Sequence, residues 1–182
     1  KRSNQTHQST TDPDARLARK SGGHEAKLAY CGNVMIENRN GLVVDTALVQ
    51  CSGTAERDAA MDMVERVEGT NRITVAADKA YDTKDFVRQM REMNATPHVA
   101  CNEKRAGGSA IDHRTTRHAG YQISQQRRKR IEEVFGWLKT VAMLRKTRHR
   151  GLLRVGWVFT YGAAAYNLVR MRNLLSPAVP SA

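Results

Sequence analysis

The chain has 182 residues, with 30 Lys and Arg against 18 Asp and Glu, a formal net charge of +12 and a pI of about 10.1. Its 40% apolar and 26% charged residues are ordinary for a globular protein, which excludes a disordered or fibrous chain. No run of about 18 apolar residues occurs, which argues against a membrane span. The length suits one domain, and the three well-separated cysteines do not form a disulfide framework.

The positive charge is concentrated in the second half of the chain. Residues 1–100 carry 14 Lys and Arg and 14 Asp and Glu, whereas residues 101–182 carry 16 against 4. A basic half joined to a neutral half favours a face that meets a polyanion, with nucleic acid as the leading candidate. A basic surface that serves only solubility is the alternative.

The first part of the chain predicts an extended or loop segment followed by a β-hairpin. Residues 1–25 are polar and lack apolar periodicity. Two strand-like runs follow, Lys27–Glu37 and Leu42–Gln50, and Asn40-Gly41 lies between them. An Asn-Gly pair is a strong hairpin signal because both residues tolerate positive φ.

The next segments alternate between helix and strand patterns. In order they are a helix over Ala55–Val67, a strand over Arg72–Ala77, a helix over Asp82–Met93 and a strand over Thr96–Ala100. This alternation predicts an α/β sheet with crossover helices. Asp82 is interpreted as the cap of the helix that it begins.

The basic half is predicted to be a loop followed by helices. Residues 101–123 are polar and basic, and we expect them to form a loop. A long helix is predicted over Ser124–Thr147, and Val155–Leu175 is helical in its second half at least. Three aromatic residues on these patterns are expected in the core rather than on a base-stacking surface: Trp137, Trp157 and Tyr166.

The long helix carries the first candidate acidic residue. Its apolar stripe consists of Ile131, Val134, Phe135, Leu138 and Ala142. At about 100° per residue, a polar edge lies beside this stripe, formed by Arg128, Glu132 and Lys139. Glu133 falls on the solvent side, so the geometry selects Glu132. An ordinary i,i+4 surface pair between Arg128 and Glu132 remains the alternative.

Asp78 is the second candidate, because it follows the apolar strand that ends at Ala77, and functional residues concentrate at the carboxyl ends of strands. A simple turn-forming role is the alternative. Together, Asp78 and Glu132 are suitable ligands for Mg²⁺ or Mn²⁺ in two-metal phosphodiester chemistry. Such sites normally need three or more carboxylates, and the pattern supplies only two.

Several segments, in order, resemble the DDE transposases of bacterial insertion sequences, the insertion-sequence-five group. They are Lys1-Arg2-Ser3-Asn4, Thr11-Asp12-Pro13-Asp14-Ala15-Arg16, Glu37-Asn38-Arg39-Asn40-Gly41-Leu42, Ala77-Asp78-Lys79-Ala80-Tyr81-Asp82, Thr96-Pro97-His98-Val99, Ile131-Glu132-Glu133-Val134-Phe135-Gly136-Trp137-Leu138-Lys139 and Ala165-Tyr166-Asn167-Leu168-Val169-Arg170. The resemblance covers nearly the whole chain.

This resemblance implies a ribonuclease-H-like mixed sheet flanked by helices and an Asp-Asp-Glu triad that binds divalent metal. Asp78 matches the second Asp and Glu132 the Glu. Arg128 and Lys139 match basic positions of the family's signature helix and are expected to contact DNA ends. The tyrosine of that signature would fall where this chain has Gln125.

The first Asp of the family triad lies on a strand upstream of the segment that matches residues 1–16. Asp12 and Asp14 do not replace it, because they match a stretch downstream of that strand. With a chain that starts at Lys1, we expect a single incomplete catalytic domain that lacks its first strand and is catalytically inactive or nearly so.

The expected function of the intact enzyme is metal-dependent DNA cleavage and strand transfer with Mg²⁺ or Mn²⁺. Further phosphate contacts are expected from Arg127, Arg130, Arg145, Lys146 and Arg148. The resemblance implies DNA ends and target DNA as partners, no membrane, a homo-oligomer, and action in the bacterial cytoplasm at the nucleoid. A DNA-binding remnant without catalysis and a metal-dependent nuclease are the alternatives.

Overall fold

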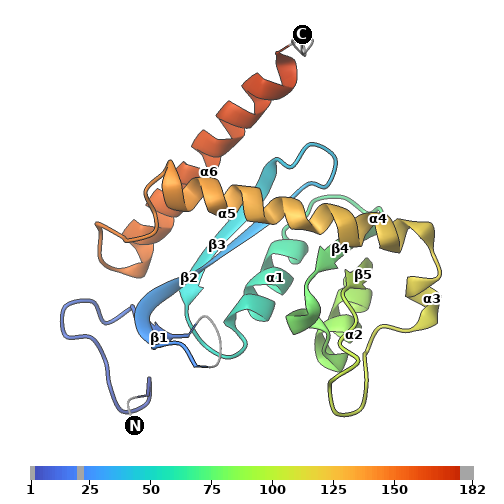
Figure 1. Ribbon diagram of the computed structural model, residues 1–182, viewed down its shortest axis with the longest axis horizontal. Coiled ribbons are helices and arrows are strands. Elements are labelled where there is room, and N and C mark those ends of the chain that lie inside the picture. Colours follow the sequence, from blue (N-terminus) through green and yellow to red (C-terminus); the bar gives the residue numbers. More distant parts are fainter. Residues whose placement is uncertain (1–2, 20–22, 177–182) are drawn as a thin grey trace. The chain divides into compact units, whose positions relative to one another are not determined.

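The computed structural model describes residues 3–19 and 23–176, which fold as two compact units (Figure 1). The hairpin unit joins Lys1–Glu56 to Ile131–Ala182, and the parallel unit is Arg57–Arg130. Both contain strands and helices, so the predicted α/β class is confirmed.

The sheet of the hairpin unit has three antiparallel strands in the order β1, β2, β3. Their bounds are Arg16–Ala18, Lys27–Ile36 and Val43–Gln50. The predicted hairpin is confirmed, and Gly41 in its turn has φ of +75°. Glu37 stabilises the turn, because its carboxylate accepts hydrogen bonds from the backbone N–H of Arg39 (2.7 Å), Asn40 (2.6 Å) and Leu42 (3.2 Å).

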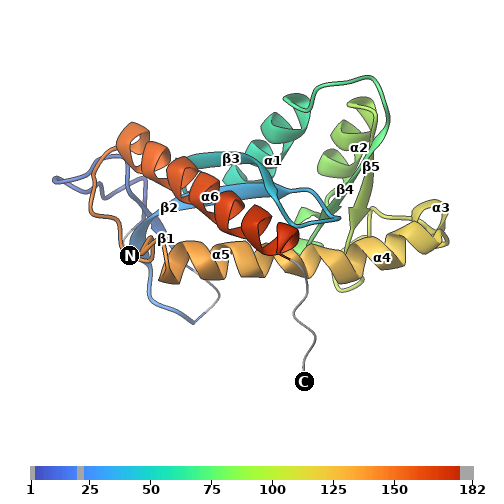
Figure 2. The ribbon, with the colours of Figure 1, turned by 90° about the horizontal axis from the view of Figure 1, so that it is seen from above.

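Two helices complete the hairpin unit, α5 (Ile131–Thr140) and α6 (Leu152–Leu175). Helix α6 packs on β3, and α5 packs on α6 and β2, as Figure 2 shows. The predicted apolar stripe of α5 faces the core, where Val134 and Leu138 are buried with Phe159 of α6. The whole of the predicted segment Val155–Leu175 is helical, and not only its second half, because α6 already begins at Leu152.

The helix predicted over Ser124–Thr147 is too long at its C-terminal end, because α5 ends at Thr140. Met143 takes a positive φ of +58°, and the Leu144 N–H donates to the Leu138 carbonyl (2.9 Å) as the chain turns back. Gly162 of α6 leaves room for this turn, since a Cβ there would lie 3.2 Å from the Leu144 side chain. Tertiary packing therefore ends the helix before its sequence pattern does.

The parallel unit is built on strands β4 (Ile73–Ala77) and β5 (Ala95–Val99), which pair in parallel and are joined through helix α2 (Lys84–Glu92). Its other elements before β5 are α1, which begins in the hairpin unit, and a short 3₁₀ helix η1: Ala55–Glu65 and Lys79–Tyr81. Three side chains of α2 are buried: Phe86, Val87 and Met90. The predicted crossover arrangement is confirmed here.

The predicted cap of α2 is wrong by one residue. Thr83 is the N-cap, and its Oγ1 accepts a hydrogen bond from the Phe86 N–H (3.2 Å). Asp82 is fully buried instead, and its two carboxylate oxygens accept hydrogen bonds from the backbone N–H of Asn102 (2.7 Å) and Ala110 (2.8 Å).

The prediction of a loop over residues 101–123 is also wrong, because only the first part of this segment is irregular. Three helical segments follow in the parallel unit: α3 (His113–Thr116), α4 (Ala119–Arg127) and η2 (Arg128–Arg130). Asp112 caps α3 by accepting the Arg114 N–H (3.1 Å), and Ile111 and Tyr121 are buried. These two apolar side chains anchor a segment that composition marks as polar.

The hairpin unit pairs its strands in antiparallel fashion, and the parallel unit pairs β4 with β5 in parallel. Among the described strands, parallel pairing is limited to β4 and β5, and antiparallel pairing to β1, β2 and β3.

Candidate functional site

Asp78 lies directly after the carboxyl end of β4, in the place that its sequence predicts. It is exposed, and it is the N-cap of η1, where its Oδ1 accepts a hydrogen bond from the Ala80 N–H (2.7 Å). This bond fixes the direction of the carboxylate, and the exposed group remains accessible to a ligand.

The two neighbouring aspartates of this segment have opposite roles. Both carboxylate oxygens of buried Asp82 are occupied by backbone N–H groups, and the Asp82 carbonyl accepts a hydrogen bond from the Arg105 guanidinium. Asp82 therefore holds residues 102–110 in place, whereas Asp78 faces solvent. Burial separates the structural aspartate from the candidate functional one.

Glu132 lies in the first turn of α5 and is exposed. Its neighbour Glu133 lies 4.0 Å from the Arg170 guanidinium of α6, a contact at the limit of an ion pair. Among the described residues of the hairpin unit, Glu132 has no such ion-pair partner. Both Glu132 and Glu133 are exposed, so the selection of Glu132 over Glu133 stays a prediction.

Asp78 and Glu132 fit a divalent metal in kind, because exposed carboxylate oxygens are the ligands that Mg²⁺ and Mn²⁺ prefer. The two side chains belong to different units. Within residues 3–19 and 23–176, no three His, Cys, Asp or Glu side chains gather as a metal-binding group. The structure therefore gives the surroundings of each carboxylate only within its own unit.

Arg128 is held in place by a residue that sequence reasoning missed. The Arg128 Nε–H donates to Gln125 Oε1 (2.9 Å), and Gln125 Nε2 donates to the carbonyl of His98 on β5 (2.6 Å). Gln125 thus connects the arginine to the strand. The available signal was the i,i+3 spacing of Gln125 and Arg128 on one helix face.

A buried polar cluster fixes α4, and with it Gln125, on β5. His98 is buried, and its Nδ1 lies 2.8 Å from Ser124 Oγ. The Tyr121 hydroxyl donates to the Val99 carbonyl (3.0 Å), and burial raises the pKa of Tyr121 to about 12. Burial, followed by the nearby His118, lowers the pKa of His98, which favours the neutral imidazole in this cluster.

The other predicted DNA-binding residues fall into two groups. Arg127 and Arg130 end the helical part of the parallel unit. The hairpin unit carries Lys139, whose ammonium lies 5.6 Å from the centre of the Phe135 ring, and an exposed segment that contains Arg145, Lys146 and Arg148. We call residues 145–150 the basic loop.

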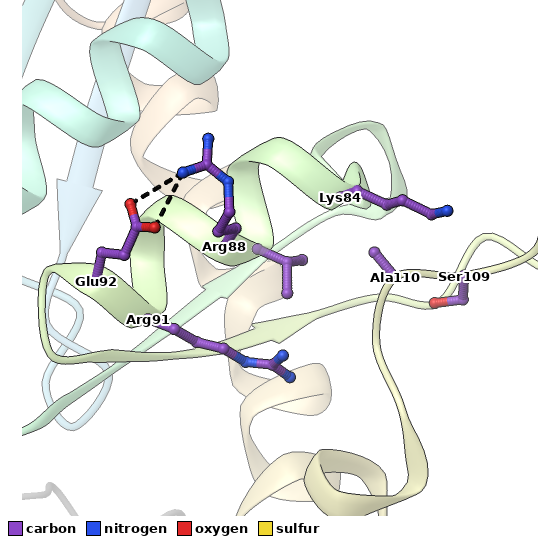
Figure 3. Close-up of a pocket in the computed structure, with 7 residues that line it drawn as sticks. Lys84, Arg88, Arg91, Glu92, Ser109 and Ala110 are labelled. Carbon is purple, nitrogen blue, oxygen red and sulfur yellow. Dashed lines mark hydrogen bonds and ion pairs between the residues drawn. The ribbon is translucent and has the colours of Figure 1, made fainter.

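The parallel unit also has a groove of about 580 Å³ beside α2, shown in Figure 3. It is lined by Lys84, Val87, Arg88, Arg91, Glu92, Ser109 and Ala110. Arg88 pairs with Glu92 (2.9 Å) and with Asp85 (2.5 Å), so part of its cationic rim is already neutralised. None of the residues predicted for the functional site lines this groove.

One predicted core residue is wrong, because Trp157 of α6 is 68% exposed and stacks on Tyr161 with nearly parallel rings (centroids 5.5 Å apart, 4° between planes). Tyr166 is buried and Trp137 is partly buried against the core, as predicted. The helical pattern of α6 is apolar nearly all round, so periodicity did not identify its exposed face.

Fold and charge together define an α/β protein with an exposed basic loop and with Asp78 and Glu132 as exposed candidate carboxylates, a combination suited to a polyanionic substrate. Comparison with protein families makes this assignment specific: residues 5–168 match the model of the transposase DDE domain. The chain belongs to this family, whose members act on DNA. Comparisons with curated proteins and with solved structures gave no match. Among the described residues, no helix is long and apolar enough to cross a membrane.

Proposed function

We propose that this chain is the catalytic part of an insertion-sequence transposase of the insertion-sequence-five group. In its intact form this enzyme cleaves DNA strands at the element's ends and joins them to target DNA. The observation that carries the proposal is the family match over residues 5–168, within which Asp78 and Glu132 are exposed carboxylates. The antiparallel strands followed by the β4–α2–β5 crossover support a ribonuclease-H-like fold in this proposal.

In this proposal Asp78 and Glu132 are two of the acidic ligands of Mg²⁺ or Mn²⁺, ions that would activate the attacking hydroxyl and stabilise the leaving oxygen. Arg128, oriented by Gln125, and Lys139 contact the phosphates of the DNA ends. Further phosphate contacts come from Arg127, Arg130, Arg145, Lys146 and Arg148. Each phosphate contact releases counterions, so affinity for DNA falls steeply as salt rises.

Three further features belong to the same proposal. The 182-residue chain alone is catalytically inactive or nearly so, because two of the three family acidic residues are identified in it. The intact enzyme acts as a homo-oligomer. Because its substrate is genomic DNA, it works in the bacterial cytoplasm at the nucleoid.

The test compares this chain with a version extended upstream to include the family's first Asp, on DNA that carries the element's ends and with Mg²⁺. The extended version should cut and join DNA. In that version Asp78→Ala and Glu132→Ala should lower the rate on the order of a thousandfold, since metal ions supply several kcal/mol of charge stabilisation. Glu133→Ala and Asp62→Ala, two other exposed carboxylates, are the matched controls.

Other outcomes would favour a different function or refute the proposed site. Products that are cut but never joined would indicate a metal-dependent nuclease. Salt-dependent DNA binding without cleavage by the extended version would indicate a DNA-binding remnant. Cleavage that survives Asp78→Ala and Glu132→Ala would refute the proposed site.

A further inference from the structure

Helix α6 begins without a cap of its own. Its N-cap is Gly151, with φ of +83° and no side chain that could accept a hydrogen bond. The first N–H groups of a helix need acceptors from elsewhere. Two carboxylates from near the start of the chain supply them: the Gly151 N–H donates to Asp12 Oδ1 (3.3 Å), and the Leu152 N–H donates to Asp14 Oδ2 (2.8 Å).

Both carboxylates are themselves fixed to the antiparallel sheet. The hydroxyl of Tyr30 on β2 donates to Asp12, with both carboxylate oxygens within 2.8 Å, and it also lies 3.1 Å from the Gly151 nitrogen. Gln50 of β3 donates to Asp14 Oδ1 (3.2 Å). Burial, and then the bond to Asp12, raise the pKa of Tyr30 to about 12, so its hydroxyl stays protonated as the donor.

This arrangement holds the basic loop, residues 145–150, because Gly151 directly follows the loop. Every residue of the loop is exposed, and four of the six are Arg or Lys. Its other end is fixed by Leu144, whose N–H bonds to the Leu138 carbonyl. The loop is thus a short cationic span between two anchored ends. Among the described residues, its side chains form no ion pair.

We propose that Asp12 and Asp14 are positioning residues for DNA binding: they hold the basic loop so that its cations face the phosphate backbone together. The inference rests on the proposed function, because it assumes DNA as the ligand of the loop. It assigns a role to the Thr-Asp-Pro-Asp segment that is separate from metal binding. Two negative charges next to a DNA-binding loop oppose binding by simple electrostatics, so a net gain requires that they act through geometry.

For Asp14→Ala, charge and geometry predict opposite changes in DNA affinity: the lost negative charge would strengthen binding, and the lost positioning would weaken it. Asp14→Ala, Asp14→Asn and the control Asp62→Ala each remove one negative charge, so all three raise the net charge by one. Only Asp14→Ala removes the oxygen that accepts the Leu152 N–H. Asn is as good a cap as Asp. Binding of the 182-residue chain to a short duplex DNA is measured over a range of salt concentrations.

We expect Asp14→Ala to bind about tenfold more weakly at 0.1 M salt, with a log–log salt slope smaller by about 2, because roughly two phosphate contacts are lost. Asp14→Asn should keep the wild-type slope and bind as well as Asp62→Ala. Tyr30→Phe changes no charge and removes the hydroxyl between Asp12 and Gly151, so it should also weaken binding. This variant keeps the test informative if Asp14→Ala fails to fold.

A loss of fold and a loss of positioning are separated by a double-mutant cycle. The background for this cycle is a chain in which all four cations of the loop are changed to Gln: Arg145, Lys146, Arg148 and Arg150. In this background Tyr30→Phe and Asp14→Ala should no longer affect affinity, whereas an effect on the fold would persist. Tighter binding by Asp14→Ala, or wild-type binding by Tyr30→Phe, overturns the inference. A wild-type chain that shows no salt-dependent DNA binding refutes the proposed function instead.

Discussion

Asp82 offers the sharpest test of how this protein arranges its basic segments. Its side chain is fully buried, and its two oxygens accept the backbone N–H groups of Asn102 and Ala110. Asp82→Ala would leave both donors without an acceptor. A buried polar group left without a partner costs about 1–3 kcal/mol, so we expect the free energy of unfolding to fall by about 2–5 kcal/mol.

The assay is urea unfolding followed by far-ultraviolet circular dichroism, together with amide hydrogen exchange at Asn102 and Ala110. Tryptophan fluorescence would not serve, because Trp137 and Trp157 both belong to the hairpin unit. Asp82→Asn keeps one acceptor and should lose less stability. Asp78→Ala removes an exposed carboxylate and should cost about 1 kcal/mol or less, the usual value of a lost cap. A wild-type unfolding midpoint for Asp82→Ala would refute the reasoning.

Three further predictions follow from individual contacts. Gln125→Ala should weaken DNA binding several-fold in a salt titration, because Arg128 loses the acceptor that orients it; equal affinity of Gln125→Ala and wild type would contradict this role. Trp157→Ala should change stability by less than about 0.5 kcal/mol in thermal unfolding, whereas Phe159→Ala should cost about 3–5 kcal/mol, because only the second side chain is buried. Burial opposes ionisation of Glu37, but hydrogen bonds from the backbone N–H groups of the turn outweigh it and lower its pKa. Its stabilisation is therefore complete above the unfolded-state pKa and is lost as pH falls through the folded-state pKa, so the stability difference between wild type and Glu37→Gln should shrink in acid; a difference that is independent of pH would contradict it.

Local signals predicted the elements whose cause is local. The Asn40-Gly41 pair located the hairpin, and alternation of apolar runs located β4, α2 and β5 within a residue or two. The prediction failed where distant contacts decide. Residues 101–123 read as a loop because their order depends on the buried carboxylate of Asp82 and on the buried side chain of Tyr121, neither of which a local pattern reveals.

In the candidate site, too, features with a local cause were predictable from the sequence, and features that depend on distant contacts were not. The position of Asp78 directly after a strand was predictable, because the apolar run that ends at Ala77 is local. The role of Gln125 was missed, because its importance comes from the His98 carbonyl on a strand distant in sequence. Exposure of Trp157 was also missed, since a helix apolar on nearly all sides does not show which side packs on β3.

The uneven charge of the chain has a structural explanation that its total charge conceals. Asp82 of the neutral half accepts backbone N–H groups from residues 102–110, and Asp12 and Asp14 accept them from Gly151 and Leu152. These carboxylates bind the backbone next to basic segments, and the cationic side chains of the basic loop are left without acidic partners among the described residues. A surface that pairs its own cations with aspartates would have to break those pairs to bind phosphate. Using the aspartates as backbone acceptors orders the basic segments while their charge stays available, so the neutral half of the chain would support the proposed DNA-binding surface without neutralising it.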